Sequence, residues 1–220
     1  MNKYELVKKI EDIAPLETQE KWDCSGWIVD TDTEEVNKIM LALTVTKDVV
    51  RLAKEKGCDM IISHHPLFEV PIEYKDIQIY ASHTPMDKAV GGTTETLLKV
   101  LGFDKFYSEN EFVRVVEFNS GVEELKKKLI KISGNVREIN NKSIKDIHKI
   151  GFCAGSGSEF IDSGDYDAFV TGDVKYHTAV ETDKVVFDIG HFESEIFILQ
   201  RFQEILGTDV EMSNEKTPFI

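Results

Sequence analysis

The chain has 220 residues, of which 41% are hydrophobic and 30% are charged, a composition typical of a folded soluble protein rather than a disordered one. The formal charge of −14 argues against nucleic acid or an anionic membrane surface as a partner, because both require a basic face. The sequence has no bilayer-length apolar stretch, no signal-peptide pattern and only three widely spaced cysteines, so we expect a cytoplasmic protein without a disulfide framework.

Helical and extended patterns alternate through the first half of the chain. Apolar spacing over residues 3–13 predicts a helix that ends before Pro15. The short apolar runs 39–45, 59–63 and 77–81 predict buried strands, and residues 46–56 and 93–101 predict helices that end at glycines. A strand, a helix of about a dozen residues and a second strand in this order indicate parallel pairing.

The second half repeats this alternation. Strands are expected over 112–118, 147–154, 168–171 and 185–189, with helices near Tyr176 and over 191–206. Ser120 and Glu123 form a capping-box pattern that predicts a helix running to about Ile132. The expected fold class is therefore α/β with mostly parallel sheets.

Five of the six histidines fall where a predicted strand ends or a helix begins, which is where α/β proteins place their chemistry. His64 and His65 follow the strand at 60–63, and His83 follows the strand that ends near Ala81. Asp87 comes four residues after His83, near the start of a helix that contains Pro85. His64, His65 and Asp87 are candidate metal ligands, His83 lies beside them, and the sixth histidine, His148, is expected at the surface.

A second group of candidates follows the strands of the second half. His191 and Glu195 are four residues apart at a strand–glycine–helix junction, so one helix face could present both to the same ion. Asp173 and His177 would share a helix face if the helix began near Gly172, as ligands, orienting residues or a proton shuttle. The Gly155-Ser156-Gly157 turn could hold an anion, or be a plain turn between a strand and a helix.

Each of these residues has a structural alternative. A histidine at a strand end can be a hydrogen-bonded structural residue, a His–Glu pair can lie on a solvated helix face, and Asp173 can be a helix N-cap. The coincidence of four clusters at one type of junction favours a shared site. Two ions would share only five candidate ligands: His64, His65, Asp87, His191 and Glu195. Coordination positions would stay open for water or substrate, which is the pattern of a catalytic metal centre. Nitrogen and oxygen donors suit Zn, Fe, Mn, Co or Ni without choosing among them.

Several motifs together resemble a known family. Those that carry the resemblance are Trp22-Asp23-Cys24-Ser25-Gly26, Ser63-His64-His65-Pro66, His83-Thr84-Pro85-Met86-Asp87, Gly91-Gly92, Gly155-Ser156-Gly157, Thr171-Gly172-Asp173 and Gly190-His191-Phe192-Glu193-Ser194-Glu195. In this order they resemble the dinuclear-metal proteins known as GTP cyclohydrolase I type 2, or NGG-interacting-factor-like proteins. The resemblance spans about residues 22–195. The sequence departs from the family pattern at two places. Thr44 stands where the family often has Asp, and Thr93-Thr94-Glu95 replaces the more usual residues after Gly91-Gly92.

The resemblance implies two intertwined three-layer α/β/α domains of similar topology, 1–108 with 184–220 and 109–183, and a dinuclear metal site between them. It also implies a homohexameric ring and a short form without the inserted domain of longer relatives. The family's ligands fall on the five residues already proposed. The activity it implies is hydrolytic opening of the guanine imidazole ring of a nucleotide, in which His83 or His177 would relay protons.

Two functions from different classes remain open at this stage. The first is a metal-dependent hydrolase that acts on a small molecule such as a nucleotide. The second is a non-enzymatic, ring-forming regulatory or metal-handling protein whose ions stabilise the assembly or pass to a client. A Glu195 variant that loses metal and turnover but keeps the oligomer would favour the enzyme, whereas one that only dissolves the ring would favour the second function.

Overall fold

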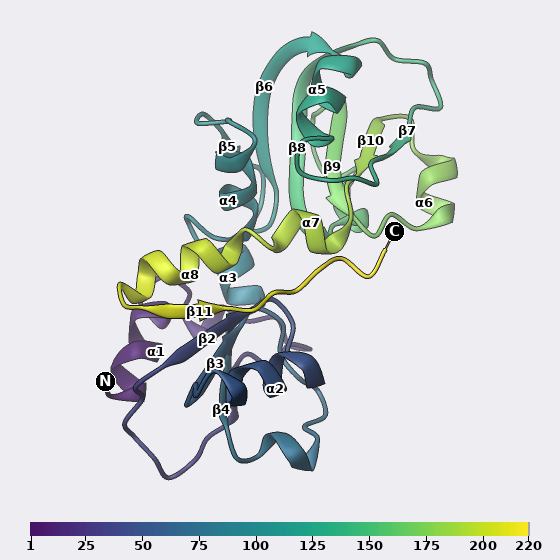
Figure 1. The fold of residues 1–220 in the computed structure, drawn as a ribbon. Helices are drawn as coiled ribbons and strands as arrows, with labels where there is room; N and C mark the ends of the chain where they lie inside the picture. Colours follow the sequence, from purple (N-terminus) through teal and green to yellow (C-terminus); the bar gives the residue numbers. More distant parts are fainter. Residues whose placement is uncertain (220) are drawn as a thin grey trace. The chain divides into compact units, whose positions relative to one another are not determined.

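The chain builds most of one α/β unit, leaves it after Gly92 to build a second, and returns at Ile198 to complete the first (Figure 1). This arrangement comes from a computed structural model that describes residues 1–219. Unit 1 contains Met1–Gly92 and Ile198–Lys216, and unit 2 contains Thr93–Phe197 together with the residues that follow Lys216. The two units are therefore interleaved in sequence, as expected.

The sheet of unit 1 has the strand order β1-β4-β3-β2-β11. Its strands are β1 (Gly26–Val29), β2 (Ile39–Ala42), β3 (Met60–Ser63), β4 (Gln78–Ala81) and β11 (Val210–Met212). All neighbours are parallel except the β1–β4 pair. The register aligns Ala42, Ser63 and Ala81 at the carboxyl ends of three adjacent strands. Residues that follow these three positions therefore emerge at one edge of the sheet.

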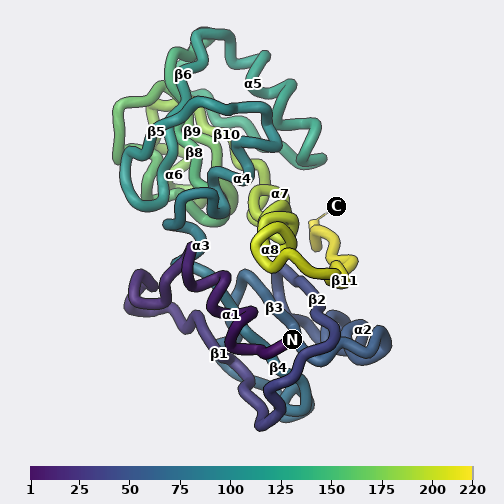
Figure 2. The backbone as a smooth tube through the Cα atoms, turned by 90° about the vertical axis from the view of Figure 1, so that its left-hand side faces the viewer, coloured from purple at the N-terminus to yellow at the C-terminus, as the bar shows by residue number. Residues whose placement is uncertain are grey.

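Helices cover both faces of this sheet. They are α1 (Lys3–Glu11), α2 (Lys47–Glu55), α3 (Thr84–Lys88) and α8 (Ile198–Leu206), with short 3-10 turns at Leu16–Thr18 and Ile72–Tyr74. Met40 and Ile61 pack with Val49 of α2 in one buried cluster. The opposite side is covered by α1 and α8, which contact each other although they come from the two ends of the sequence (Figure 2).

The sheet of unit 2 has the strand order β5-β6-β8-β9-β10-β7. Its strands are β5 (Tyr107–Ser108), β6 (Arg114–Gly121), β7 (Arg137–Ile139), β8 (Asp146–Ser156), β9 (Ala168–Gly172) and β10 (Val185–Asp188). The central pairs β8–β9 and β9–β10 are parallel, and the outer pairs are antiparallel. The carboxyl ends of β8, β9 and β10 therefore lie at one edge, as in unit 1.

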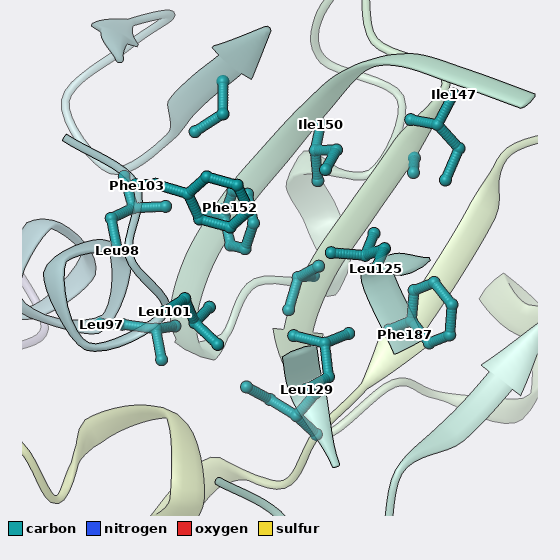
Figure 3. Packing of buried hydrophobic residues seen from close by; sticks show 14 of the residues in the cluster. Leu97, Leu98, Leu101, Phe103, Leu125, Leu129, Ile147, Ile150, Phe152 and Phe187 are labelled. Carbon is teal, nitrogen blue, oxygen red and sulfur yellow. The ribbon is translucent and has the colours of Figure 1, made fainter. Parts of the chain in front are cut away.

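The core of unit 2 lies on both faces of its sheet. Leucines of α4 (Thr93–Val100) and α5 (Val122–Leu129) pack over Phe152 and Ile150 of β8 and Phe187 of β10 (Figure 3). A second buried cluster on the other face includes Phe169 and Val186, against which Ala179 of α6 (Tyr176–Glu181) packs. The remaining helices are a 3-10 turn at Ser158–Phe160 and α7 (His191–Glu195).

The segment Thr93-Thr94-Glu95, which departs from the family pattern, has a structural role inside unit 2. Glu95 of α4 forms a buried ion pair with Arg114 of β6, with 2.8 Å between Glu95 Oε1 and Arg114 Nε. The Thr94 hydroxyl accepts a hydrogen bond from the Ala154 amide (3.1 Å) and donates one to the Phe112 carbonyl. These contacts fix α4 against its own sheet.

Most elements lie where the sequence pattern predicts them, with differences at three places. The predicted helix over 191–206 is two helices, α7 and α8, which belong to different units. The prediction that Ser120 caps a helix is wrong. Strand β6 continues through Gly121, so α5 begins after Gly121 and has no side-chain cap. The short strands β1, β5, β7 and β11 have too few residues to produce a clear alternation.

The domain boundaries expected from the sequence, 1–108 with 184–220 and 109–183, differ from the two units. β10 (Val185–Asp188) pairs with β9 and β7 and so belongs to the sheet of unit 2. α4 likewise packs in the core of unit 2. The chain therefore returns to unit 1 later, at Ile198, and leaves it earlier, after Gly92. Every helix within residues 1–219 is too short or too polar to cross a bilayer.

Candidate metal centre

Three imidazoles gather at the carboxyl edge of the unit 1 sheet. His64 and His65 follow β3, and His83 follows β4 at the start of α3. One nitrogen of each ring lies within 4.8 Å of a nitrogen of the other two. His64 is fully buried, and the side chain of His83 is 17% exposed. The parallel register of β3 and β4 explains this convergence, because it places Ser63 beside Ala81.

Hydrogen bonds from the surrounding unit hold each ring by its Nδ1 atom. His64 Nδ1 lies 3.0 Å from the Ser82 carbonyl, and His83 Nδ1 lies 3.1 Å from a carboxylate oxygen of Asp23. Carbonyl and carboxylate oxygens only accept, so Nδ1 carries a hydrogen on both rings, and Nε2 is the nitrogen that could bind a metal ion. This is how proteins commonly orient metal-binding histidines.

His65 is held differently. Its Nδ1 atom lies 2.7 Å from the hydroxyl oxygen of Thr44, which follows β2. A hydroxyl can donate or accept, so it fixes the plane of the ring but not the position of its hydrogen. Thr44 is the position where the sequence departs from the family pattern, and here its hydroxyl contacts a candidate ligand.

Asp23 organises the loop beneath His83. Its carboxylate accepts hydrogen bonds from His83 Nδ1, the Ser25 hydroxyl (2.7 Å), the Thr84 hydroxyl (2.5 Å) and the amides of Cys24 and Thr84. Burial alone would raise the pKa of this carboxyl group, but the hydrogen bonds from His83, Thr84 and Ser25 outweigh burial and hold the pKa well below its usual range. Sequence reasoning assigned Asp23 no role, although it lies in one of the motifs that carry the resemblance.

Asp87 faces the same cluster from α3. Its Oδ1 atom is buried 3.4 Å from His64 Nε2 and accepts no hydrogen bond from any of residues 1–219. A buried carboxylate oxygen without a hydrogen-bond donor is costly in a folded protein. A bound cation would remove that cost, so the donor set of unit 1 fits a metal ion.

Unit 2 contributes the His191–Glu195 pair of α7. His191 Nε2 lies 3.0 Å from Glu195 Oε2, as the four-residue spacing predicts. Asp173, in the loop after β9, places a carboxylate oxygen 2.7 Å from His191 Nδ1. Asp173 reaches this position with a left-handed backbone (φ 54°), which aspartate tolerates better than most residues. Of the three roles that the sequence left open for Asp173, this contact with one nitrogen of the predicted ligand His191 fits an orienting residue best.

The two carboxylates change the acidity of His191. Burial would lower the pKa of this imidazole, but hydrogen bonds and charge attraction from Glu195 and Asp173 raise it to about 9. In the metal-free protein the ring is therefore charged at neutral pH. A cation between His191 and Glu195 would take the place of that proton.

The backbone of Gly155 lies close to the Glu195 carboxylate and restricts its position. Gly155, near the end of β8, has φ 69°, and a Cβ atom added there would lie 2.1 Å from Glu195 Oε1. The Gly155 amide donates to the Ser194 hydroxyl (2.9 Å), which in turn donates to the His191 carbonyl (2.8 Å). The Gly155-Ser156-Gly157 turn thus supports α7. The Gly157 amide also donates a hydrogen bond within the unit, to the Thr171 hydroxyl.

The structure brings together most of the predicted site residues within their own units. His64, His65, His83 and Asp87 form one group in unit 1, and His191, Glu195 and Asp173 form another in unit 2. His177 belongs to neither group among the described residues. It lies exposed on α6, where its ring packs edge-on against Tyr176. Asp173 and His177 do not share a helix face, because α6 begins at Tyr176 rather than near Gly172.

Comparison with known proteins shows similarity over nearly the whole chain. A protein from Clostridium perfringens named GTP cyclohydrolase 1 type 2 homolog is 34% identical, over 98% of this chain and 97% of its own length. A protein of the same name from Campylobacter jejuni is 31% identical, over 94% of this chain and 91% of its own length.

The fold also matches solved structures. Reduced HcgD from Methanocaldococcus jannaschii superposes with a TM-score of 0.83 at 24% identity, covering 96% of each chain. The model of the family described as Duf34/NIF3 (NGG1p interacting factor 3) matches residues 1–219. The chain therefore belongs to the Duf34/NIF3 (NGG1p interacting factor 3) family.

Proposed function

We propose that this protein is a metal-dependent hydrolase with a dinuclear centre, and that it opens the guanine ring of a nucleotide by hydrolysis. The observation that carries the proposal is the group of three imidazoles in unit 1, whose ligand nitrogens lie within 4.8 Å of one another. Hydrogen bonds already hold these rings by Nδ1. The choice of substrate class rests on the relatives named GTP cyclohydrolase 1 type 2 homolog.

The proposed ligands come from both units. His64, His65 and Asp87 would supply one set, and His191 with Glu195 the other. The donors are imidazole nitrogens and carboxylate oxygens without thiolate, a combination that suits Zn, Fe, Mn, Co or Ni. Support comes from the buried Asp87 oxygen that no donor reaches and from the 3.0 Å approach of His191 to Glu195. When bound, a pair of divalent cations lowers the pKa of water and stabilises negative charge that develops during hydrolysis.

The residues of the chain would position and move protons around this centre. His83 Nδ1 donates to Asp23, so its Nε2 atom is the basic nitrogen, and the Asp23 carboxylate stabilises the ring when Nε2 takes up a proton. This is the arrangement that a proton relay requires. His83 therefore suits the relay role, whereas the exposed His177 has no carboxylate partner among the described residues.

The test is turnover of GTP by protein loaded with each candidate metal, with release of formate and a ring-opened product followed by mass spectrometry. We expect turnover in the wild type and its loss in His64→Asn and Glu195→Gln. His148→Asn is the matched control, since His148 is exposed and its Nδ1 contacts only the Asn119 side chain, 3.0 Å away. The control should keep full activity.

His83→Asn separates the relay from ligation. If His83 relays protons, this variant keeps its metal content and loses turnover. If His83 is a ligand, it loses metal as well. Absence of ring-opened product with every metal would contradict the hydrolase proposal. Size-exclusion measurements of the same variants test the expected hexamer, and a ring that dissolves when metal is removed, without any turnover, would favour the non-enzymatic function.

A further inference from the structure

Unit 2 contains a cavity of about 560 Å³ beside α7. The residues of its wall that matter here are Arg137, Asp173, Asp188, Gly190, Glu193 and Phe219. Asp173 is shared with the candidate metal centre, because the same carboxylate holds His191. The cavity therefore adjoins the side of His191 that faces away from Glu195.

Glu193 is the distinctive group of this wall. It is only 8% exposed, yet it makes no hydrogen bond or ion pair with any of residues 1–219. Its carboxylate folds over Gly190, where an added Cβ atom would lie 2.1 Å from Glu193 Oε2. Gly190 also has φ 88°, so this close approach needs glycine. Its carboxylate oxygens are not among the buried atoms that lack a partner, so they remain accessible from the cavity, and N–H groups of a ligand there could replace water as their donors.

The other charged groups of the wall already have partners. Asp188 accepts hydrogen bonds from Arg137 and from the amides of Val174 (2.9 Å) and Gly190 (3.0 Å). Asp173 is occupied by His191. Glu193 is therefore the one carboxylate of this wall whose two oxygens are both available to a ligand.

Two further residues suggest the shape of that ligand. The ring of Phe219 lines the cavity and is 64% exposed, so it offers a flat apolar surface. The Arg137 side chain is 67% exposed and uses one of its nitrogens on Asp188, which leaves other N–H groups for an anionic substituent. A planar heterocycle that carries an anionic group matches these features.

We infer that Glu193 binds the edge of a guanine-type base in this cavity, accepting N–H groups from two adjacent positions of the ring. A carboxylate matches this edge because both of its oxygens accept, and guanine presents two neighbouring donors. Adenine presents a donor beside an acceptor and would leave one oxygen unpaired. The inference rests on the proposed nucleotide substrate and names the residue that selects its base.

The experiment measures binding of guanosine, inosine and adenosine to the full-length, metal-free protein by calorimetry. Inosine lacks the amino group at position 2 and so offers one donor fewer. We expect guanosine to bind roughly tenfold or more tightly than inosine, and adenosine to bind more weakly than either. In Glu193→Gln the preference for guanosine over inosine should disappear. Glu181→Gln, an exposed change on α6, is the control and should keep it.

The comparison of nucleosides on the wild type needs no variant, so a folding defect in Glu193→Gln cannot obscure the result. Equal affinity for guanosine and inosine, or a preference that survives in Glu193→Gln, would overturn the inference. The outcome is separate from that of the hydrolase assay. A base preference without GTP turnover would contradict the proposed reaction and leave the base site standing, and turnover without a base preference would do the reverse.

Discussion

The two groups of candidate ligands achieve rigidity in different ways. In unit 1, three imidazoles follow the ends of neighbouring strands, and a carbonyl, a hydroxyl and a buried carboxylate hold their Nδ1 atoms. In unit 2, His191 is held by a half-exposed carboxylate, Asp173, and Glu195 is held by close contact with the Gly155 backbone. Hydrogen bonds thus hold both groups, and the second group also depends on steric fit. Substitutions that remove a hydrogen bond should affect either unit, whereas an added methyl group should damage the ligand pair of unit 2.

The largest effect is expected from Gly155→Ala. The new methyl group would lie 2.1 Å from Glu195 Oε1, so the carboxylate has to move away from His191. We expect metal affinity to fall by on the order of 100-fold, because the change displaces a proposed ligand. Metal titration of the purified variant measures this.

Gly57→Ala is the matched control for that change. Gly57 has φ 70°, nearly the same as Gly155, but an added Cβ atom meets nothing within 4 Å. Both variants should lose about 1–2 kcal/mol of stability from the left-handed backbone. Only Gly155→Ala should lose metal. Equal loss of metal in both variants would show that steric fit at Glu195 does not matter.

The next effect is expected from the carboxylates that hold the histidines. Asp23→Asn removes the charge that fixes His83 and leaves its hydrogen-bond donors poorly matched, so we expect about 1–3 kcal/mol of destabilisation. Turnover should fall about 10- to 100-fold.

Asp173→Asn should reduce metal affinity while stability changes by less than about 0.5 kcal/mol, since the Asp173 side chain is 49% exposed. Denaturant unfolding and metal titration of both variants test the contrast, which a larger stability loss in Asp173→Asn would contradict.

A smaller effect is expected at Thr44. Thr44→Val keeps the shape of the side chain but removes the hydroxyl 2.7 Å from His65 Nδ1. We expect metal affinity to fall by up to about tenfold, because an outer partner of a ligand is lost. Thr44→Ser keeps the hydroxyl and should bind metal as the wild type does. If the serine and valine variants bind metal equally well, the hydroxyl does not hold His65.

The last prediction concerns pH in the metal-free protein. The pKa of His191 is raised to about 9, above its ordinary value of 6.5. The charged ring therefore stabilises the folded unit fully below about pH 6.5, and this stabilisation is lost as the pH rises through 9. An NMR titration of the His191 ring should give a midpoint near 9 that falls in Glu195→Gln. A midpoint near 6.5 in the wild type would contradict the pairing.

Much of this site could be predicted from the sequence because the residues are close together in it. The His64-His65 pair and the four-residue spacing of His191 and Glu195 depend only on local geometry, and the structure confirms the contact within the second pair. The strand ends at Ser63 and Ala81 were also visible as apolar runs that stop at polar residues.

The partners that hold these rings were harder to predict. Asp23 meets His83 across 60 positions of sequence, and its role depends on how a loop folds under α3. Helix α7 ends after Glu195, although the apolar spacing continues into α8, because two separately packed units divide the pattern. Antiparallel edge strands such as β7 are too short to show alternation, so the boundaries of unit 2 could not be read from periodicity.

The central proposal is that His64, His65, Asp87, His191 and Glu195 together bind one pair of cations. Anomalous diffraction from crystals of the metal-loaded protein tests it most directly. We predict two peaks roughly 3.5–4 Å apart, with His64, His65 and Asp87 on one side and His191 and Glu195 on the other. A single ion bound only by the unit 1 histidines, with His191 and Glu195 still paired to each other, would contradict it.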